Sequence, residues 1–217
     1  RGLGDVYKRQ DIMFYMVYSR RDTMGFDARD LTTLTREDLA QTLFKNKEKT
    51  GASTALEANK IAKTVILTYQ SALLEGNSLA LSRIGHLVIL DKKARPGRNP
   101  LTGENFEVSA RRTVSMRKTP QSDRPYLKRQ DMLLKLKEAL SGVEDVNVVG
   151  VYDVYHDFIK RVTDKLHRVE FRGLGVFYPA VREAGEVRNP KTGEKKFSKE
   201  RVKIAFRPSK KLLSMLN

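Results

Sequence analysis

The chain has 217 residues, of which 42 are Lys or Arg and 26 are Asp or Glu, giving a formal net charge of +16. This excess of positive charge favours a polyanionic partner, either nucleic acid or an anionic membrane surface. The absence of cysteine excludes disulfide frameworks, thiolate catalysis and cysteine-ligated zinc. We expect the three scattered histidines to be surface or packing residues.

Residues 1–33 differ from the rest of the chain, because acidic and basic side chains nearly cancel there. We expect a poorly ordered, partly non-native N-terminal extension, with Arg1–Gln10 as a leader and Met13 or Met24 as a genuine start. The apolar run Ile12–Tyr18 is too short to span a bilayer and is not followed by a signal-peptide cleavage site. We therefore expect a cytoplasmic protein.

Two helices are predicted next. The first begins at Thr35, where Asp38 three residues later resembles a capping box. The segment Thr50–Ser53 ends this helix and caps the second, in which apolar residues follow the 3.6-residue period until Gly76 ends it. Two helices joined by a short turn predict a helical hairpin.

From Leu79 the apolar pattern changes to period two, which predicts strands, and Gly85 allows a sharp turn between the first two. Residues 98–103 read Arg-Asn-Pro-Leu-Thr-Gly. The Asn-Pro step cannot continue a helix and Thr-Gly reverses the chain, so these residues predict a turn. Basic residues alternate with apolar ones on both sides, which predicts the tip of a long β-hairpin arm.

The same order recurs after a linker at residues 119–126. A second tip, Arg-Asn-Pro-Lys-Thr-Gly, stands ninety positions on at residues 188–193, and from the strands onward the two halves keep this offset. The first helices align at an offset of 93, and Pro208-Ser209 caps a last short helix. We predict an internal duplication, with repeat 1 at residues 34–118 and repeat 2 at residues 127–217.

Each half resembles the bacterial histone-like HU/IHF proteins. The resemblance rests on Thr-Arg-Glu-Asp-Leu at 35–39, Arg-Gly-Leu-Gly-Val-Phe at 172–177, the two tips, and Phe-Arg-Pro-Ser-Lys at 206–210. It implies an α+β fold in which each unit has a helical hairpin and a three-stranded antiparallel sheet with a long β-hairpin arm. Family members are mostly dimers, so two tandem units imply an intrachain pseudo-dimer, with pairing between chains as the alternative.

The resemblance also implies a non-catalytic architectural protein that binds double-stranded DNA in the nucleoid and needs no cofactor or metal. Pro100 and Pro190 are expected to wedge between base steps while Arg98 and Arg188 enter the minor groove. The other candidates share a place on the arms or the sheet, where they would contact DNA and neutralise phosphates. They are Asn99, Asn189, Lys92, Lys93, Arg95, Arg111, Arg112, Arg117, Lys118, Arg182, Lys191, Lys195, Lys196, Lys199, Arg201, Lys203, Arg207 and Lys210.

Departures from the family pattern are expected to make the halves unequal. The turn at residues 82–85 has one glycine fewer than the family's Arg-Gly-Phe-Gly, and residues 118–120 run into the linker where a third helix would start. In the second arm, Glu183 and Glu186 replace a lysine and a proline of the first. These carboxylates weaken the attraction of that arm for phosphates, so we expect the two arms to grip DNA unequally.

Other functions remain open from the sequence. An IHF-type bender with a preferred site is compatible with unequal arms, because minor-groove readout is degenerate and leaves no short motif. RNA as a competing ligand is also undecided. A basic scaffold for a protein or membrane partner fits the charge but has no need of wedge prolines. An enzyme is disfavoured, since the sequence offers no nucleophile–base pair, phosphate-cradling loop or metal-ligand cluster.

Overall fold

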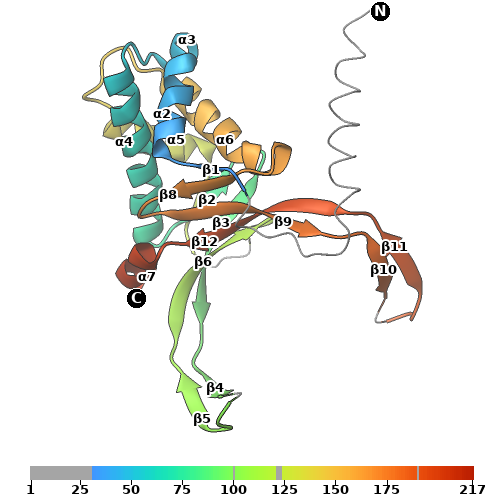
Figure 1. Cartoon of the computed structure of the whole chain (residues 1–217). Coiled ribbons are helices and arrows are strands. Elements are labelled where there is room, and N and C mark those ends of the chain that lie inside the picture. Colours follow the sequence, from blue (N-terminus) through green and yellow to red (C-terminus); the bar gives the residue numbers. More distant parts are fainter. Residues whose placement is uncertain (1–30, 100, 121–123, 190) are drawn as a thin grey trace, which may run out of the picture. The chain divides into compact units, whose positions relative to one another are not determined.

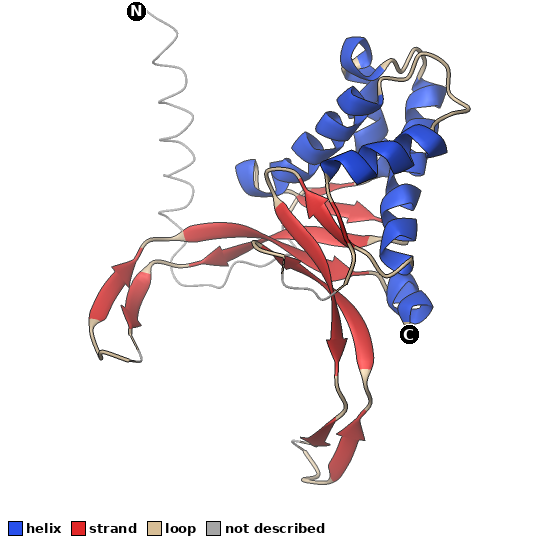
Figure 2. Cartoon of the chain, turned by 180° about the vertical axis from the view of Figure 1, so that it is seen from behind, coloured by secondary structure: helices blue, strands red, loops and turns tan. Residues whose placement is uncertain are grey.

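The computed structural model describes residues 31–99, 101–120, 124–189 and 191–217. Most of the extension predicted at residues 1–33 therefore lies outside the described residues. Leu31–Asn217 forms one compact unit. In this unit the long helices cover one face of the sheets, and two hairpin arms extend from the sheet layer (Figures 1 and 2).

Repeat 1 folds in the predicted order, with helices before strands. Its first long helix begins at Thr35, which forms the predicted capping box with Asp38. The second is capped by Thr54 and not by Ser53, because Glu57 N donates to Thr54 Oγ1 and the Glu57 carboxylate accepts from Thr54 N. The elements are β1 (Thr33–Leu34), α2 (Arg36–Lys45), α3 (Lys47–Thr50), α4 (Ala55–Leu74), β2 (Ser78–Leu81), β3 (Gly85–Lys92), β4 (Arg95–Arg98), β5 (Asn105–Val108) and β6 (Arg111–Arg117).

Repeat 2 has the same order of long helices and strands, but no counterpart of the short helix α3 lies between α5 and α6, a segment that the structure describes in full. Its strands from β8 onward begin ninety residues after their counterparts, as the duplication predicts, whereas β7 begins 93 residues after β1. It adds one helix, α7, whose N-cap is Ser209, where Leu212 N donates to the serine Oγ at 3.0 Å. The described residues of repeat 1 include no counterpart of α7. The elements are β7 (Tyr126–Leu127), α5 (Arg129–Ala139), α6 (Val148–Asp164), β8 (Arg168–Phe171), β9 (Gly175–Arg182), β10 (Gly185–Arg188), β11 (Lys195–Ser198), β12 (Arg201–Pro208) and α7 (Lys210–Leu216).

The two repeats exchange their first strands. β1 of repeat 1 pairs in parallel with β8 of repeat 2, and β7 of repeat 2 pairs in parallel with β2 of repeat 1. Each four-stranded sheet, in the order β1-β8-β9-β12 or β7-β2-β3-β6, therefore holds one strand from the other repeat. The outer strands β6 and β12 also pack against each other. The repeats are thus joined through their sheets.

The helices of both repeats enclose one hydrophobic core. Tyr69 of α4 and Tyr155 of α6 are buried there with their ring centroids 4.7 Å apart. Neither repeat closes this core alone, so the predicted intrachain pseudo-dimer is confirmed. The largest buried side chains come from both repeats; they are Leu39, Leu43, Ile61, Tyr69, Leu73, Leu79, Leu87, Tyr152, Tyr155, Phe158, Phe171 and Phe177.

A glycine lets the helix ends of the two repeats approach closely. An ideal Cβ at Gly150, in the first turn of α6, would lie 1.8 Å from Lys49 O in α3. No residue with a side chain fits this position without moving one backbone away from the other. Beside it Asn147 N donates to Thr50 O at 3.0 Å, so the backbones of the repeats are hydrogen-bonded directly at this point.

A buried histidine lies at the centre of the helical layer, in agreement with the predicted packing role. His156 is 4% exposed; its Nδ1 lies 2.7 Å from Tyr152 O and its Nε2 lies 3.3 Å from the Tyr69 hydroxyl. A carbonyl oxygen only accepts, so Nδ1 carries the proton and the neutral ring accepts from Tyr69 at Nε2. Burial is the main reason that the pKa of His156 is lowered to about 4.

This histidine is expected to make the fold sensitive to acid. The unfolded chain binds a proton at His156 near pH ~6.5, whereas the folded chain resists it down to about pH 4. Stability is therefore lost as pH falls between these values, by up to about 3 kcal/mol. Chemical denaturation at pH ~7 and ~4.5 should show a smaller loss for His156→Gln than for the wild type. An equal loss in both proteins would exclude this role.

Candidate nucleic-acid interface

Each arm is an antiparallel hairpin that continues two adjacent strands of its sheet. In repeat 1, β3 and β6 continue after two-residue interruptions into β4 and β5, where Arg98 pairs with Asn105. In repeat 2, β9 and β12 continue in the same way into β10 and β11, where Arg188 pairs with Lys195. The interruptions fall at the same place in both arms and separate a tip segment from the base (Figure 2).

Both predicted tips are closed by the same backbone hydrogen bonds. Asn99 N donates to Glu104 O at 2.8 Å, and Gly103 N donates to Asn99 O at 2.9 Å. In the second arm Asn189 N donates to Glu194 O and Gly193 N donates to Asn189 O, both at 2.8 Å. The described residues of the two tips therefore make equivalent turn hydrogen bonds, which confirms the hairpin interpretation of both.

The asparagine side chains support these turns. Asn99 Oδ1 accepts from Leu101 N at 3.0 Å, and Asn189 Oδ1 accepts from Lys191 N at the same distance. Such Asx turns fix the backbone locally, so both asparagines have a structural role in addition to the predicted contact with DNA.

The arginine before each tip lies against the turn. Arg98 Nε donates to Gly103 O at 2.9 Å, and Arg188 Nε donates to Gly193 O at 3.3 Å. Each bond uses one of the five guanidinium donors and holds the side chain at the tip. The positive charge is thus placed beside the turn before any ligand arrives.

The two predicted wedge residues, Pro100 and Pro190, lie outside the described residues. Their neighbours differ between the arms. Leu101 is 94% exposed at the first tip, whereas Lys191 stands at the same place in the second. The first tip therefore presents an additional apolar side chain, and the second an additional charge.

The cationic candidates lie where the sequence predicts them, along the arms, on the outer strands and at the start of α7. All of them are exposed except Arg117, which is half-buried. The arms and their bases carry Lys92, Lys93, Arg95, Arg98, Arg182, Arg188, Lys191, Lys195, Lys196 and Lys199, while Arg111, Arg112, Arg117, Lys118, Arg201, Lys203, Arg207 and Lys210 lie on or beside β6, β12 and α7.

Lys195 and Arg112 each have a carboxylate partner within the chain. Lys195 Nζ lies 3.1 Å from Glu186 Oε2 across the second arm. Arg112 Nε lies 3.2 Å from Asp91 Oδ1 at the base of the first arm. All four side chains are more than half exposed, so these ion pairs are weak. A phosphate can compete for either cation, at the cost of one surface pair.

The linker contributes a basic residue that sequence reasoning gave no role. Arg124 Nη2 lies 2.7 Å from Asp91 Oδ2, which fastens the linker to β3. The Arg124 hydrogen bond is the main reason that the pKa of Asp91 is below its ordinary value. No sequence signal marks this pair, because the two residues are far apart in the chain and belong to no motif.

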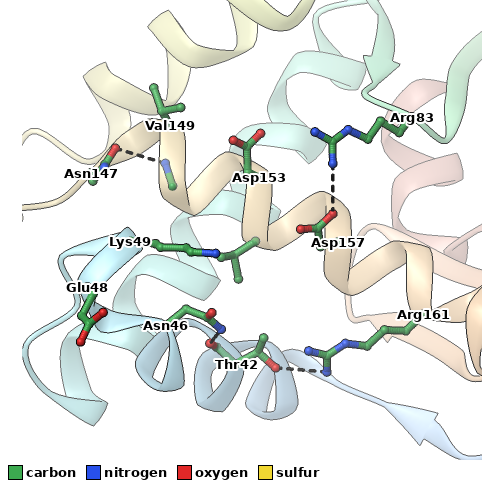
Figure 3. A pocket seen from close by; sticks show the side chains of 12 residues that line it. Thr42, Asn46, Glu48, Lys49, Arg83, Asn147, Val149, Asp153, Asp157 and Arg161 are labelled. Atoms are coloured by element: carbon green, nitrogen blue, oxygen red, sulfur yellow. Dashed lines mark hydrogen bonds and ion pairs between the residues drawn. The ribbon is translucent and has the colours of Figure 1, made fainter. Parts of the chain in front are cut away.

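A hollow of about 650 Å³ lies on the helical side, between α2, α3 and α6 (Figure 3). Its lining has as many carboxylates as cations. Arg83 and Asp157 lie 3.9 Å apart, and Arg161 donates to Thr42 Oγ1 at 3.3 Å. Balanced charge gives no attraction for a polyanion, so the arms and outer strands remain the candidate nucleic-acid interface.

The family model described as "Bacterial DNA-binding protein" matches the chain twice, at residues 34–121 and 127–217. The chain belongs to this family. It carries two copies of the family unit in tandem, and the two copies pair within one polypeptide. The linker predicted at residues 119–126 overlaps the end of the first match, so the predicted domain boundaries remain a proposal.

Curated relatives and a solved structure are similar to single units of the chain. Integration host factor subunit alpha of Pseudoalteromonas translucida is 42% identical over 84 residues, which are 39% of this chain and 81% of the relative. The same subunit of Bordetella pertussis is 42% identical over 83 residues, 38% of this chain and 70% of the relative. An Anabaena HU–DNA cocrystal structure has 28% identity and a TM-score of 0.27, covering 36% of this chain and 87% of that chain.

The predicted HU/IHF family and the α+β fold of two tandem units are thus confirmed. In the described part of the chain, no helix is long and apolar enough to cross a membrane.

Proposed function

We propose that this chain is a non-catalytic architectural protein that binds double-stranded DNA with low sequence specificity and bends it. The observation that carries the proposal is the pair of arms, which rise from one shared core and end in equivalent tips with an arginine held at each turn. In this proposal the cations of the arms and outer strands neutralise phosphates, and Pro100 and Pro190 wedge between base steps. Its place in the cell would be the nucleoid.

Charge and exposure support this function over a scaffold for membranes. The cations follow two long hairpins and the strands between them, which suits the backbone of a duplex. The single polypeptide supplies both arms, so the arms assemble without a second chain. Every molecule therefore carries one copy of each arm.

Fluorescence transfer between the ends of a labelled duplex of a few tens of base pairs tests the function. Transfer is expected to rise on binding, because bending brings the ends together. If about six to ten phosphates are contacted, affinity should fall roughly 10³–10⁵-fold between about 50 and 200 mM salt. Binding without a rise in transfer would leave a basic coat protein, and absence of binding would overturn the DNA proposal.

A bender with a preferred site is the second candidate, because the arms differ. Glu186 is paired with Lys195 in the second arm, whereas Pro96 takes its place in the first, and Leu101 faces solvent only at the first tip. Unequal arms would favour DNA whose two flanks differ in deformability. Selection of the bound duplexes from a pool of random sequences decides between the two candidates, since enrichment of one sequence supports site preference.

A further inference from the structure

The C-terminal helix α7 occupies a seat that joins the two repeats. Its N-cap residue Ser209 lies on the β8–β9 turn, where the hydroxyl donates to Gly173 O at 2.6 Å. The helix then packs on α4 and β6 of repeat 1. At its end Asn217 Oδ1 accepts from Arg112 N at 2.6 Å. Gln70 of α4 is buried, and its Nε2 lies 4.0 Å from Met215 Sδ of this helix.

The equivalent seat on repeat 2 has no helix among the described residues. The offset of ninety residues between the repeats identifies the segments that correspond to the surroundings of α7. They are the β2–β3 turn, the end of β6, the last turns of α6 and the start of β12. Residues from all four segments line a groove of about 540 Å³. Arg124 of the linker bonds instead to Asp91 on β3 of repeat 1.

Side chains of the groove are more exposed than their counterparts near α7, as expected where no helix packs on them. Ile84 and Ile204 are half-buried, whereas their counterparts Leu174 and Val114 near α7 are buried. Lys160, the counterpart of buried Gln70, has 47% of its side chain exposed. The groove therefore keeps an apolar floor that remains partly open to water.

The rim of the groove is more basic than the seat of α7. Arg83 takes the position of Gly173, and both adopt left-handed backbone, with φ of 63° and 88°. The turn is thus kept, but a glycine is replaced by a cation whose side chain is 77% exposed. Of the described residues, six cations and no carboxylate line the groove; the cations are Arg83, Arg117, Lys118, Lys160, Arg201 and Lys203. Outside the lining, Asp157 lies 3.9 Å from Arg83 and Asp164 lies 3.8 Å from Lys160, and these exposed pairs are weak.

We propose that this groove binds a short amphipathic helix of a partner protein that carries carboxylates beside an apolar stripe. The size and lining follow from the occupied twin, which holds the seven-residue helix α7. The charge excludes a basic helix: α7 itself has Lys210 and Lys211 and no carboxylate, so α7 of a second copy would meet six cations. The phosphates of a DNA duplex could bind the cations, but they make no favourable contact with the apolar floor of the groove.

The test uses the full chain without DNA, so its result does not depend on the proposed DNA function. The probe is a capped peptide of residues 208–217 with Lys210→Glu and Lys211→Glu, and the unchanged peptide is its matched control. Amide NMR resonances of Ile84, Val202 and Ile204 should shift with the acidic peptide. The basic parent peptide should bind at least about tenfold more weakly.

Charge reversal in the groove provides the second comparison. Lys160→Glu with Arg201→Glu should weaken the acidic peptide about tenfold or more, while Lys63→Glu, an exposed residue of α4 outside the groove, should change its affinity less than about twofold. Equal binding of both peptides, or no shift at these amides, would overturn the proposal. The proposal would also be overturned if a short DNA duplex shifted these amide resonances and the acidic peptide did not. The groove would then be part of the DNA-binding surface.

Discussion

Replacing Pro100 and Pro190 together by alanine is expected to abolish most of the DNA bending while preserving binding. A proline ring at a rigid tip can separate two stacked base pairs, whereas an alanine side chain is too small to hold them apart. Affinity depends mainly on phosphate contacts by exposed cations, so it should fall by no more than about tenfold. The rise in end-to-end fluorescence transfer at saturating protein measures the effect.

The matched control is Pro96→Ala, which removes an exposed proline of β4 that lies away from the tip. It should bend DNA as the wild type does. The single variants should each retain part of the transfer, because each arm acts at its own position on the duplex. A double variant that bends DNA fully would show that the prolines are not the wedges.

Replacing Phe171 by alanine is expected to destabilise the whole unit by about 3–5 kcal/mol. This ring is 1% exposed. It stacks on Tyr155 at 5.7 Å and on Phe158 at 6.2 Å, and it meets Phe177 edge-on at 6.3 Å between ring centroids. Its removal leaves a cavity in the core that both repeats share, so one transition should unfold both.

Denaturant unfolding followed by circular dichroism measures this loss. Phe197→Ala is the matched control, because the same side chain is 75% exposed on the second arm. It should change the free energy of unfolding by less than about 0.5 kcal/mol. Two separate transitions in the Phe171→Ala variant, with one left unchanged, would contradict a shared core.

The sequence alone predicted the duplication, the hairpin tips, the capping box at Thr35 and the missing third helix of repeat 1. These features rest on local signals. The Asn-Pro and Thr-Gly steps have few allowed conformations, a cap requires only Thr35 and Asp38, and strand period shows within a few residues. Their physical causes lie within one turn of chain, so no knowledge of the partner segment is needed.

Packing decided the rest. The exchanged strands β1 and β7 have only two residues each, too few to show a period, and they form because a strand edge of the other repeat is available to them. The closeness of Gly150 to Lys49 and the linker bond between Arg124 and Asp91 join residues distant in sequence. The basic groove is a further case, because a surface left by an absent helix exists only once the neighbouring elements have packed.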